Sequence, residues 1–280
     1  GLTVNEDAGG QTISGFATPQ ANATNSSDSL EASQTFTYTV ERRSGEAISG
    51  GSSLFTTAPA IAPNGTLTYT PKANANGATV FDVIVRDNGL TANSGVDSQR
   101  FNSAFTITVN SINDAPVLTD RTTTLTLDED DFNNSGRTIS ALLDNSHITE
   151  TEDNVSPGTA SDNTVLEAIA ITATSVSGGT LQFSTDGTNF SNVGSVSNSS
   201  ALLLDPDDKI RLVPTQDFFG DAGNFTFRAW DKKTTTSGTS ALSAGNKVDT
   251  STNGGTSEFS TFADVVDITV NPINASPVLT

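Results

Sequence analysis

The stretch Val109–Thr119 reads VNSINDAPVLT, and the same pattern returns in Val270–Thr280 as VNPINASPVLT. In both copies an alternating, strand-like run leads into a short segment with Asn and Pro, and a second apolar run follows. Such a repeat indicates where one domain ends and the next begins, because the junction itself recurs. We therefore expect a domain boundary within residues 113–116.

Two further alignments support the same division of the chain. The sequence GTLTYTPKANANGATVFDVIVRDNG in the first half resembles DKIRLVPTQDFFGDAGNFTFRAWDK in the second, which places Asp87 opposite Asp231. LTVNED near the start resembles LTLDED, which places Glu6 opposite Glu129. The predicted organisation is a first domain over residues 1–113, a longer second domain over 114–274, and the start of a further repeat over 275–280.

Hydrophobic periodicity predicts β-strands throughout. Near the repeated junction, Phe105, Ile107 and Val109 alternate with polar residues, as the exposed and buried faces of a strand require. Turn-forming pairs such as Asn64-Gly65 separate many short runs of this kind. The sequence therefore predicts an all-β fold of two tandem antiparallel β-sandwiches, with one short helical candidate at Ile139–His147.

Composition and charge exclude several classes of function. The chain has 280 residues, with 13 Lys and Arg against 32 Asp and Glu, a formal net charge of −19. Such a surface repels phosphate groups, so we expect no nucleic-acid partner and no membrane insertion. The absence of cysteine excludes disulfides, thiolate metal sites and cysteine nucleophiles. With no start Met, signal peptide or long apolar run, we expect a fragment that spans no membrane.

No residue pattern points to catalysis, and we expect that the protein is not an enzyme. His147 is the only histidine and has no nucleophile motif beside it, so we interpret it as a solvent-facing loop residue. Trp230 is the only tryptophan, and we expect a half-buried aromatic that covers the sheet edge. It should face away from Phe225 and Phe227, because it lies at the opposite phase of the same strand.

Two stretches make the second domain longer than the first. Residues 144–162 are polar and acidic, and residues 232–257 are rich in Thr, Ser, Gly and Asn. We expect exposed loops without secondary structure in both, since loops of this length are commonly functional. These loops support an alternative function, a module that binds a cell-surface glycan or a protein.

The motifs NEDAG, RDNG and INDAPVLT resemble the tandem cadherin-like and Ig-like repeats of giant bacterial surface adhesins. TLQFSTDGTNF, ALLLDPDDKIRLVP, FRAWD and NGGTSEFS resemble a longer relative in such arrays. The resemblance covers nearly the whole chain and implies two Greek-key sandwiches that form a structural extender or adhesion module of a bacterial cell-surface or secreted protein. It also implies an extracellular location, neighbouring repeats of the same chain as partners, and Ca²⁺ between repeats.

The predicted calcium ligands lie around the junction. The last two strands of such a sandwich are antiparallel, so the loop with Asp231 should lie where the chain enters the second domain, near Asp114 on the linker. The resemblance implies that Glu6 reaches the far end of the first domain. Calcium takes six to eight oxygen ligands. The predicted ligands of the interdomain calcium ion are Glu6, Asn113, Asp114, Asp162 and Asp231.

Further candidates lie at the outer ends of the two domains, namely Asp28, Asp87 and Glu129. At the second junction Ala275 stands where the family has Asp, which removes one ligand. A plainer interpretation remains open for all these residues. Asp and Asn are common in turns because their side chains accept hydrogen bonds from nearby backbone N–H groups.

Overall fold

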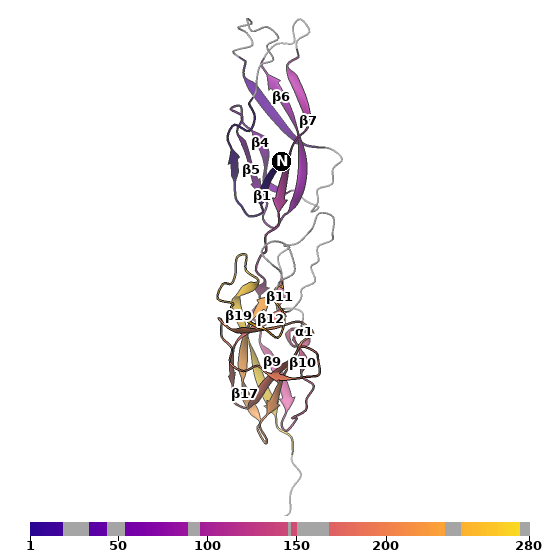
Figure 1. Cartoon of the computed structure of the whole chain (residues 1–280), viewed down its shortest axis with the longest axis vertical. Helices are drawn as coiled ribbons and strands as arrows, with labels where there is room; N and C mark the ends of the chain where they lie inside the picture. Colours follow the sequence, from indigo (N-terminus) through magenta and orange to yellow (C-terminus); the bar gives the residue numbers. More distant parts are fainter. Residues whose placement is uncertain are drawn as a thin grey trace, which may run out of the picture. The chain divides into compact units, whose positions relative to one another are not determined.

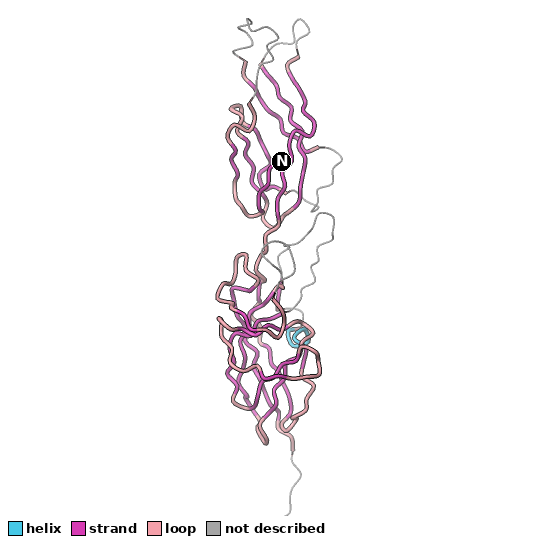
Figure 2. The backbone as a smooth tube through the Cα atoms, viewed as in Figure 1, coloured by secondary structure: helices cyan, strands magenta, loops and turns pink. Residues whose placement is uncertain are grey.

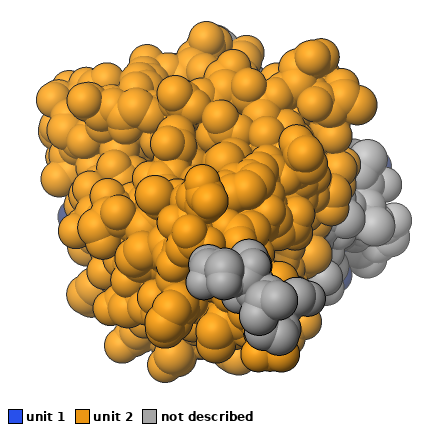
Figure 3. All heavy atoms as spheres, turned by 90° about the horizontal axis from the view of Figure 1, so that it is seen from below, with its two compact units in different colours: residues 1–112, 152–162 blue, residues 113–151, 163–280 orange. Residues whose placement is uncertain are grey.

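The computed structural model describes residues 1–18, 34–43, 54–88, 96–144, 147–149, 168–232 and 242–274. The chain divides into two compact units, coloured separately in Figure 3. Unit 1 contains Gly1–Ile112 and unit 2 begins at Asn113, so the boundary falls directly before residue 113. The further repeat predicted at 275–280 lies outside the described residues.

Unit 1 is a sandwich of two sheets. A four-stranded sheet of order β1-β7-β6-β3 lies against a three-stranded sheet of order β2-β5-β4. The strands are β1 (Leu2–Asn5), β2 (Gln11–Ile13), β3 (Phe36–Arg42), β4 (Phe55–Ile61), β5 (Leu67–Pro71), β6 (Gly77–Asp87) and β7 (Ser98–Asn110). In β5, Leu67 and Tyr69 are buried while Thr68 is exposed, so period-two alternation builds the core.

Unit 2 contains a six-stranded sheet of order β18-β15-β12-β17-β19-β9, a four-stranded sheet of order β10-β16-β13-β14 and the pair β11-β8. Its first strands are β8 (Val117–Leu118), β9 (Thr123–Asp128), β10 (Arg137–Thr138), β11 (Ile148–Thr149), β12 (Ala168–Val176) and β13 (Gly179–Ser184). The others are β14 (Ser191–Asn192), β15 (Ala201–Leu204), β16 (Lys209–Pro214), β17 (Gly220–Trp230), β18 (Lys247–Val248) and β19 (Phe259–Asn271). The predicted all-β sandwich class is confirmed.

The only helix in the described residues is α1 (Ile139–Leu143), drawn in cyan in Figure 2. It begins at Thr138, whose hydroxyl accepts a hydrogen bond from the Ala141 N–H, and it ends at Asp144 in the left-handed conformation. Ile139 and Leu143 are fully buried and belong to the main core of unit 2. No helix in the described part of the chain is long and apolar enough to cross a membrane.

The six-stranded sheet buries side chains on both of its faces. Phe225 and Phe227 point into the main core. Trp230 points to the other face, as predicted, but it is fully buried rather than half-buried. It belongs to a second cluster with Leu203 and Phe259, against which Val248 packs. This cluster is the outer core.

The segment that closes the outer core lies in a region predicted to have no secondary structure. In the stretch 232–257, strand β18 pairs with β15 and places Val248 over the sheet. In the stretch 144–162, strand β11 pairs with β8. The prediction failed because these short strands have little local periodicity and form only where they meet a partner strand.

One strand pair in each unit departs from the predicted antiparallel arrangement. The first strand β1 runs parallel to the last strand β7, with Leu2 opposite Ile107 (Figure 1). In unit 2, β9 runs parallel to β19, with Leu125 opposite Ile268. All other strand pairs in the described residues are antiparallel.

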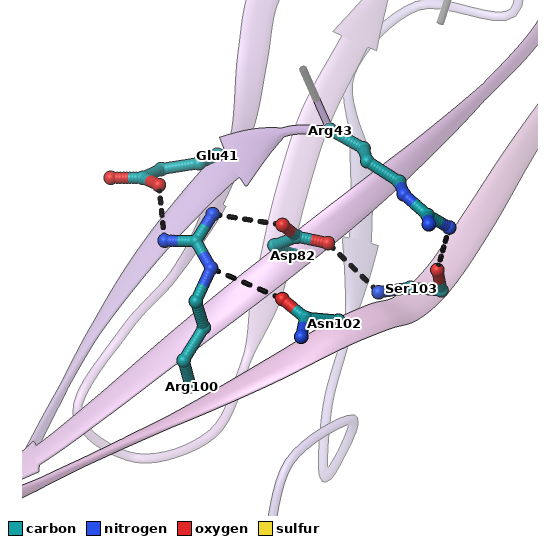
Figure 4. A network of polar contacts seen from close by, with 6 residues as sticks. All are labelled: Glu41, Arg43, Asp82, Arg100, Asn102 and Ser103. Atoms are coloured by element: carbon teal, nitrogen blue, oxygen red, sulfur yellow. Dashed lines mark hydrogen bonds and ion pairs between the residues drawn. The ribbon is translucent and has the colours of Figure 1, made fainter. Parts of the chain in front are cut away.

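A β-bulge interrupts β7, and a polar network fills it (Figure 4). The Asp82 carboxylate accepts a 2.8 Å hydrogen bond from the Ser103 N–H and forms a 2.8 Å ion pair with Arg100. Arg100 also pairs with Glu41 at 2.8 Å, and Arg43 donates to the Ser103 hydroxyl. The network therefore ties β3, β6 and β7 together where the regular ladder is broken.

A β-bulge also interrupts β19, and a positively charged side chain stabilises it, whereas in β7 the group is a carboxylate. Arg228 donates to the backbone carbonyls of Ser260 at 2.9 Å and Thr261 at 2.6 Å. The Ser260 hydroxyl accepts a 3.0 Å hydrogen bond from the Ala229 N–H. In unit 1 the Asp82 carboxylate accepts from a backbone N–H of the bulge, and in unit 2 the Arg228 guanidinium donates to backbone carbonyls of the bulge. Both side chains therefore satisfy backbone groups that have no partner in the strand pairing at the bulge.

The outer core should contribute strongly to the stability of unit 2. Leu203→Ala removes a fully buried side chain beside Trp230, and we expect the free energy of unfolding to fall by about 2–5 kcal/mol. Val265→Ala, at a position 37% exposed in β19, is the matched control and should cost less than about 1 kcal/mol. Urea denaturation followed by the fluorescence of Trp230, the only tryptophan, measures both. Equal losses would contradict a packed outer core.

The Asp82 network should make unit 1 sensitive to acid. The Ser103 N–H and Arg100 lower the pKa of Asp82 below its ordinary value of 3.8. Its contribution to stability is therefore present above pH 3.8 and is lost as the pH falls through the native pKa. Asp82→Asn should lower the melting temperature at neutral pH and reduce the loss of stability on acidification. Circular dichroism should show this change, while the unfolding curve of Trp230 in unit 2 should stay the same.

Candidate functional site

Polar residues are buried where the chain enters unit 2. Asp231 directly follows β17, and its side chain is 1% exposed. Asn113, the first residue of the unit, is 3% exposed. Buried polar groups of this kind are costly unless they find hydrogen-bond partners or a cation. This cluster is therefore the strongest candidate for a functional site in unit 2.

Three oxygen atoms converge on the side-chain nitrogen of Asn113. Its Nδ2 lies 2.8 Å from Asp231 Oδ2, 3.2 Å from the Ser257 carbonyl oxygen and 3.3 Å from the Asp114 carbonyl oxygen. An amide nitrogen has only two hydrogens to share among three acceptors. The amide oxygen Oδ1 of Asn113 is buried and has no hydrogen-bond partner in the described residues. The cluster thus places a buried amide oxygen beside a carboxylate and two backbone carbonyls.

A turn near the end of unit 2 supplies one of these oxygens. The Asp231 N–H donates to the Glu258 carbonyl at 3.1 Å, and the Ala115 N–H donates to the Gly255 carbonyl at 2.8 Å. Gly254 and Gly255 both have positive φ, which glycine adopts without strain. These contacts hold the Ser257 carbonyl beside Asn113. Ser257 was not among the predicted ligands; the Asn-Gly-Gly turn signal was visible in the sequence, but its position near Asn113 was not.

The oxygen donors of the cluster fit a hard cation. Calcium takes carboxylate, amide and backbone carbonyl oxygens at about 2.3–2.6 Å. Asp231, Asp114, Asn113 Oδ1 and the Ser257 carbonyl are donors of this type. No group of three or more acidic, histidine or cysteine side chains that could hold a metal occurs in the described residues. A metal here would therefore need the amide and backbone oxygens as well as the carboxylates.

Glu6 has a well-defined place within unit 1. Its side chain is 2% exposed, and Oε1 accepts a 2.8 Å hydrogen bond from the Ile112 N–H. The Glu6 N–H donates to the Asn110 carbonyl at 2.9 Å. Glu6 thus reaches the C-terminal end of unit 1, where the resemblance placed it. Its role as a calcium ligand stays a prediction.

The further candidates have separate surroundings. Glu129 repeats the contacts of Glu6, because its Oε1 accepts a 2.6 Å hydrogen bond from the Ile273 N–H. Asp87 ends β6, and its N–H donates to the Asp97 carbonyl at 3.0 Å. The remaining predicted ligands, Asp28 and Asp162, lie outside the described residues.

The prediction of a solvent-facing His147 is wrong. Its side chain is 4% exposed. Nε2 lies 2.6 Å from the Thr123 hydroxyl, and Nδ1 contacts the Leu143 carbonyl oxygen. The polar sequence around His147 concealed this, since the pairing of β11 with β8 turns the ring inward.

Comparisons with known proteins assign no function. No family model matches the chain, and no curated protein matches it. Among solved structures, it is similar to zebrafish RET cadherin-like domains 1 to 4, with a TM-score of 0.31 and 10% identity over 86% of this chain and 42% of that chain. It is also similar to an endo-fucoidan hydrolase from glycoside hydrolase family 107, with a TM-score of 0.26 and 15% identity over 85% of this chain and 24% of that chain.

The Asn113 amide should stabilise unit 2 when calcium is absent. Asn113→Ala removes the donor that contacts Asp231, and we expect the free energy of unfolding to fall by about 1–3 kcal/mol. Asn274→Ala is the matched control, because Asn274 occupies the same place in the repeated motif but is exposed. Urea denaturation in chelator, followed by Trp230 fluorescence, tests the pair. Equal stability of both variants and the unmodified protein would rule out the structural role of the amide.

Proposed function

We propose that the chain is a structural extender or adhesion module of a bacterial cell-surface or secreted repeat protein, stiffened by calcium at the start of unit 2. The observation that carries the proposal is the convergence of oxygen atoms on Asn113 directly after the last residue of unit 1. A cation bound there would act on the residues that directly follow the last strand of unit 1.

The role of the ion follows from the charges around it. The carboxylates of Asp114 and Asp231 lie on residues that share the Asn113 amide. Calcium bound to them would neutralise their repulsion and replace weak amide contacts with metal–oxygen bonds. Rotation of the Asn113 amide would bring Oδ1 to the position that Nδ2 now occupies. The linker residues would then have less conformational freedom.

The composition of the chain supports an extracellular location. Its net charge of −19 leaves carboxylates that an extracellular divalent cation can neutralise. A fold built without cysteine relies on its cores and, in this proposal, on metal rather than on disulfides. The partners proposed for it are neighbouring repeats of the same chain.

The alternative of a glycan- or protein-binding module stays a prediction. Trp230 supplies no stacking surface, because it is fully buried in the outer core. The described part of the stretch 232–257 includes Leu242 and Val248, which pack against that core. No observation in the described residues favours the alternative over the extender.

Calorimetric titration of the whole chain with calcium tests the proposal. The unmodified protein should release or absorb heat with a defined stoichiometry, and Asp231→Asn should weaken binding at least about tenfold because a charged ligand is lost. Asp267→Asn, which removes an exposed carboxylate in β19, should bind as the unmodified protein does.

Small-angle X-ray scattering with calcium and then with chelator provides the second readout. Calcium should narrow the distribution of interatomic distances in the unmodified protein and leave it unchanged in Asp231→Asn. Absence of both heat and a scattering change would overturn the calcium-stiffened extender.

A further inference from the structure

The end of strand β17 places two consecutive side chains in two different surroundings. Trp230 is fully buried in the outer core, on the second face of the six-stranded sheet. Asp231 is also buried, and its Oδ2 lies 2.8 Å from Asn113 Nδ2. The cluster around Asn113 is the candidate cation site, formed by Asn113, Asp114, Asp231 and Ser257. One short piece of backbone therefore belongs both to the outer core and to the candidate cation site.

The residues that lead into β19 contact the same two regions. The Ser257 carbonyl belongs to the candidate cation site, and Phe259 belongs to the outer core. Between them, the Glu258 carbonyl accepts a 3.1 Å hydrogen bond from the Asp231 N–H. The Glu258 carboxylate accepts a 3.3 Å hydrogen bond from Trp230 Nε1. Glu258 thus contacts one region through its backbone and the other through its side chain.

The turn before β19 restricts separate movement of these residues. The Gly254 N–H donates to the Phe259 carbonyl at 2.8 Å, and the Ser257 N–H donates to the Gly254 carbonyl at 3.1 Å. The Ser257 hydroxyl accepts from the Phe259 N–H at 3.1 Å and donates to the Thr252 carbonyl at 3.0 Å. A Cβ atom on Gly254 would collide with the Thr261 side chain, so the turn packs directly on β19. A shift of the Ser257 carbonyl would therefore move Phe259 as well.

These contacts link the candidate cation site to the outer core. A cation bound by Asp231 and the Ser257 carbonyl would fix both residues, and the hydrogen bond between Asp231 and Glu258 would then hold Glu258 against Trp230. Conversely, a well-packed outer core would keep the two oxygen donors where a cation needs them. Coupling of this kind is reciprocal, because a change that favours one event favours the other by the same factor.

We propose that Glu258 is a positioning residue for the candidate cation site, and that it couples binding at the site to the packing of the outer core around Trp230. Its carboxylate binds the indole N–H, so Glu258 acts on the site through Trp230 and through its own backbone. The inference deepens the proposed function and rests on it for the ion, whereas the coupling itself exists without an ion. A bound cation would then stiffen the second face of the sheet as well as the residues around Asn113.

A double-mutant cycle on the whole chain in chelator tests the coupling without calcium. Glu258→Ala removes the acceptor of the Trp230 N–H, and Asn113→Ala removes the amide that contacts Asp231 and Ser257. Asn113→Ala raises the equilibrium constant of unfolding by some factor in the unmodified protein. That factor should be at least about threefold smaller in the Glu258→Ala background, because the amide contacts are then already weakened. Urea denaturation followed by Trp230 fluorescence measures all four proteins.

A second cycle is the matched control. It combines Asn113→Ala with Val265→Ala, which shortens a side chain that is 37% exposed in β19. The effects of these two changes should multiply to within about twofold. Independent effects in the Glu258 cycle would overturn the coupling. Equal departures from independence in the two cycles would also overturn it, because the effect would not be specific to Glu258.

Calorimetric titration with calcium tests whether Glu258 acts on the site. Glu258→Ala should weaken binding about tenfold, as expected when a residue that supports a metal ligand is removed. Glu258→Gln keeps an acceptor for the Trp230 N–H and should bind within about threefold of the unmodified protein. Asp249→Ala is the matched control, because it removes an exposed carboxylate of the same segment that accepts from the Ser251 N–H. It should bind as the unmodified protein does.

Two results of this titration would overturn the positioning role. Equal weakening by Glu258→Gln and Glu258→Ala would show that the charge of Glu258 matters, as it would for a calcium ligand. Binding of Glu258→Ala with the affinity of the Asp249→Ala control would show that Glu258 has no effect on the site.

The emission of Trp230 separates this inference from the proposed function. Trp230 is the only tryptophan, and its indole N–H is bound to Glu258, so its emission reports on that contact. In the unmodified protein calcium should change the emission with the same midpoint as the heat. Heat without a change in emission would overturn the coupling and leave the calcium-stiffened extender intact. Non-independent effects in the Glu258 cycle without any heat would overturn calcium binding and leave the coupling in place.

Discussion

The parallel pairing of first and last strands closes both sandwiches. In unit 1 the pairing of β1 with β7 adds β1 to the edge of a sheet that would otherwise end at β7. In unit 2 the pairing of β9 with β19 places Leu125 in the main core beside Ile268. Because these strands come from opposite ends of each unit, their pairing joins the ends of the chain segment to one core. The contacts of Glu6 with Asn110 and Ile112, and those of Glu129 with Asn271 and Ile273, depend on it.

The start of unit 2 shows how a buried polar cluster follows from that closure. Once β19 is fixed by its pairing with β9, β17 beside it brings Asp231 to the end of the sheet where Asn113 enters. The turn before β19 delivers the Ser257 carbonyl to the same place. Oxygen atoms gather there because the end of β17 and the turn before β19 both meet Asn113, whose own amide oxygen is buried. Carboxylate, amide and backbone carbonyl oxygens are the ligands that a hard cation such as calcium takes.

The six-stranded sheet of unit 2 differs from a simple sandwich because its second face is also partly buried. Alanines at 168, 170 and 201 leave room on this face for Trp230, and Val248 packs over the cluster. Small residues beside one large aromatic are a way to fill space between a sheet and a covering segment at high density. The described part of the extra length of unit 2, which includes Leu242 and Val248, thus helps to build a second core.

The sequence by itself determined the all-β class, the long alternating strands such as β7 and β19, and the direction in which Trp230 faces. These features depend on period-two alternation and on local turn residues, which any short window of sequence contains. Glu6 could be placed at the end of unit 1 only through a family resemblance. Only the tertiary structure decided the parallel pairing of first and last strands, the burial of Trp230 and His147, and the convergence of oxygen atoms on Asn113. The partners of Asn113 are 118 and 144 residues away in the sequence, so their approach depends on how the sheets pack rather than on local pattern.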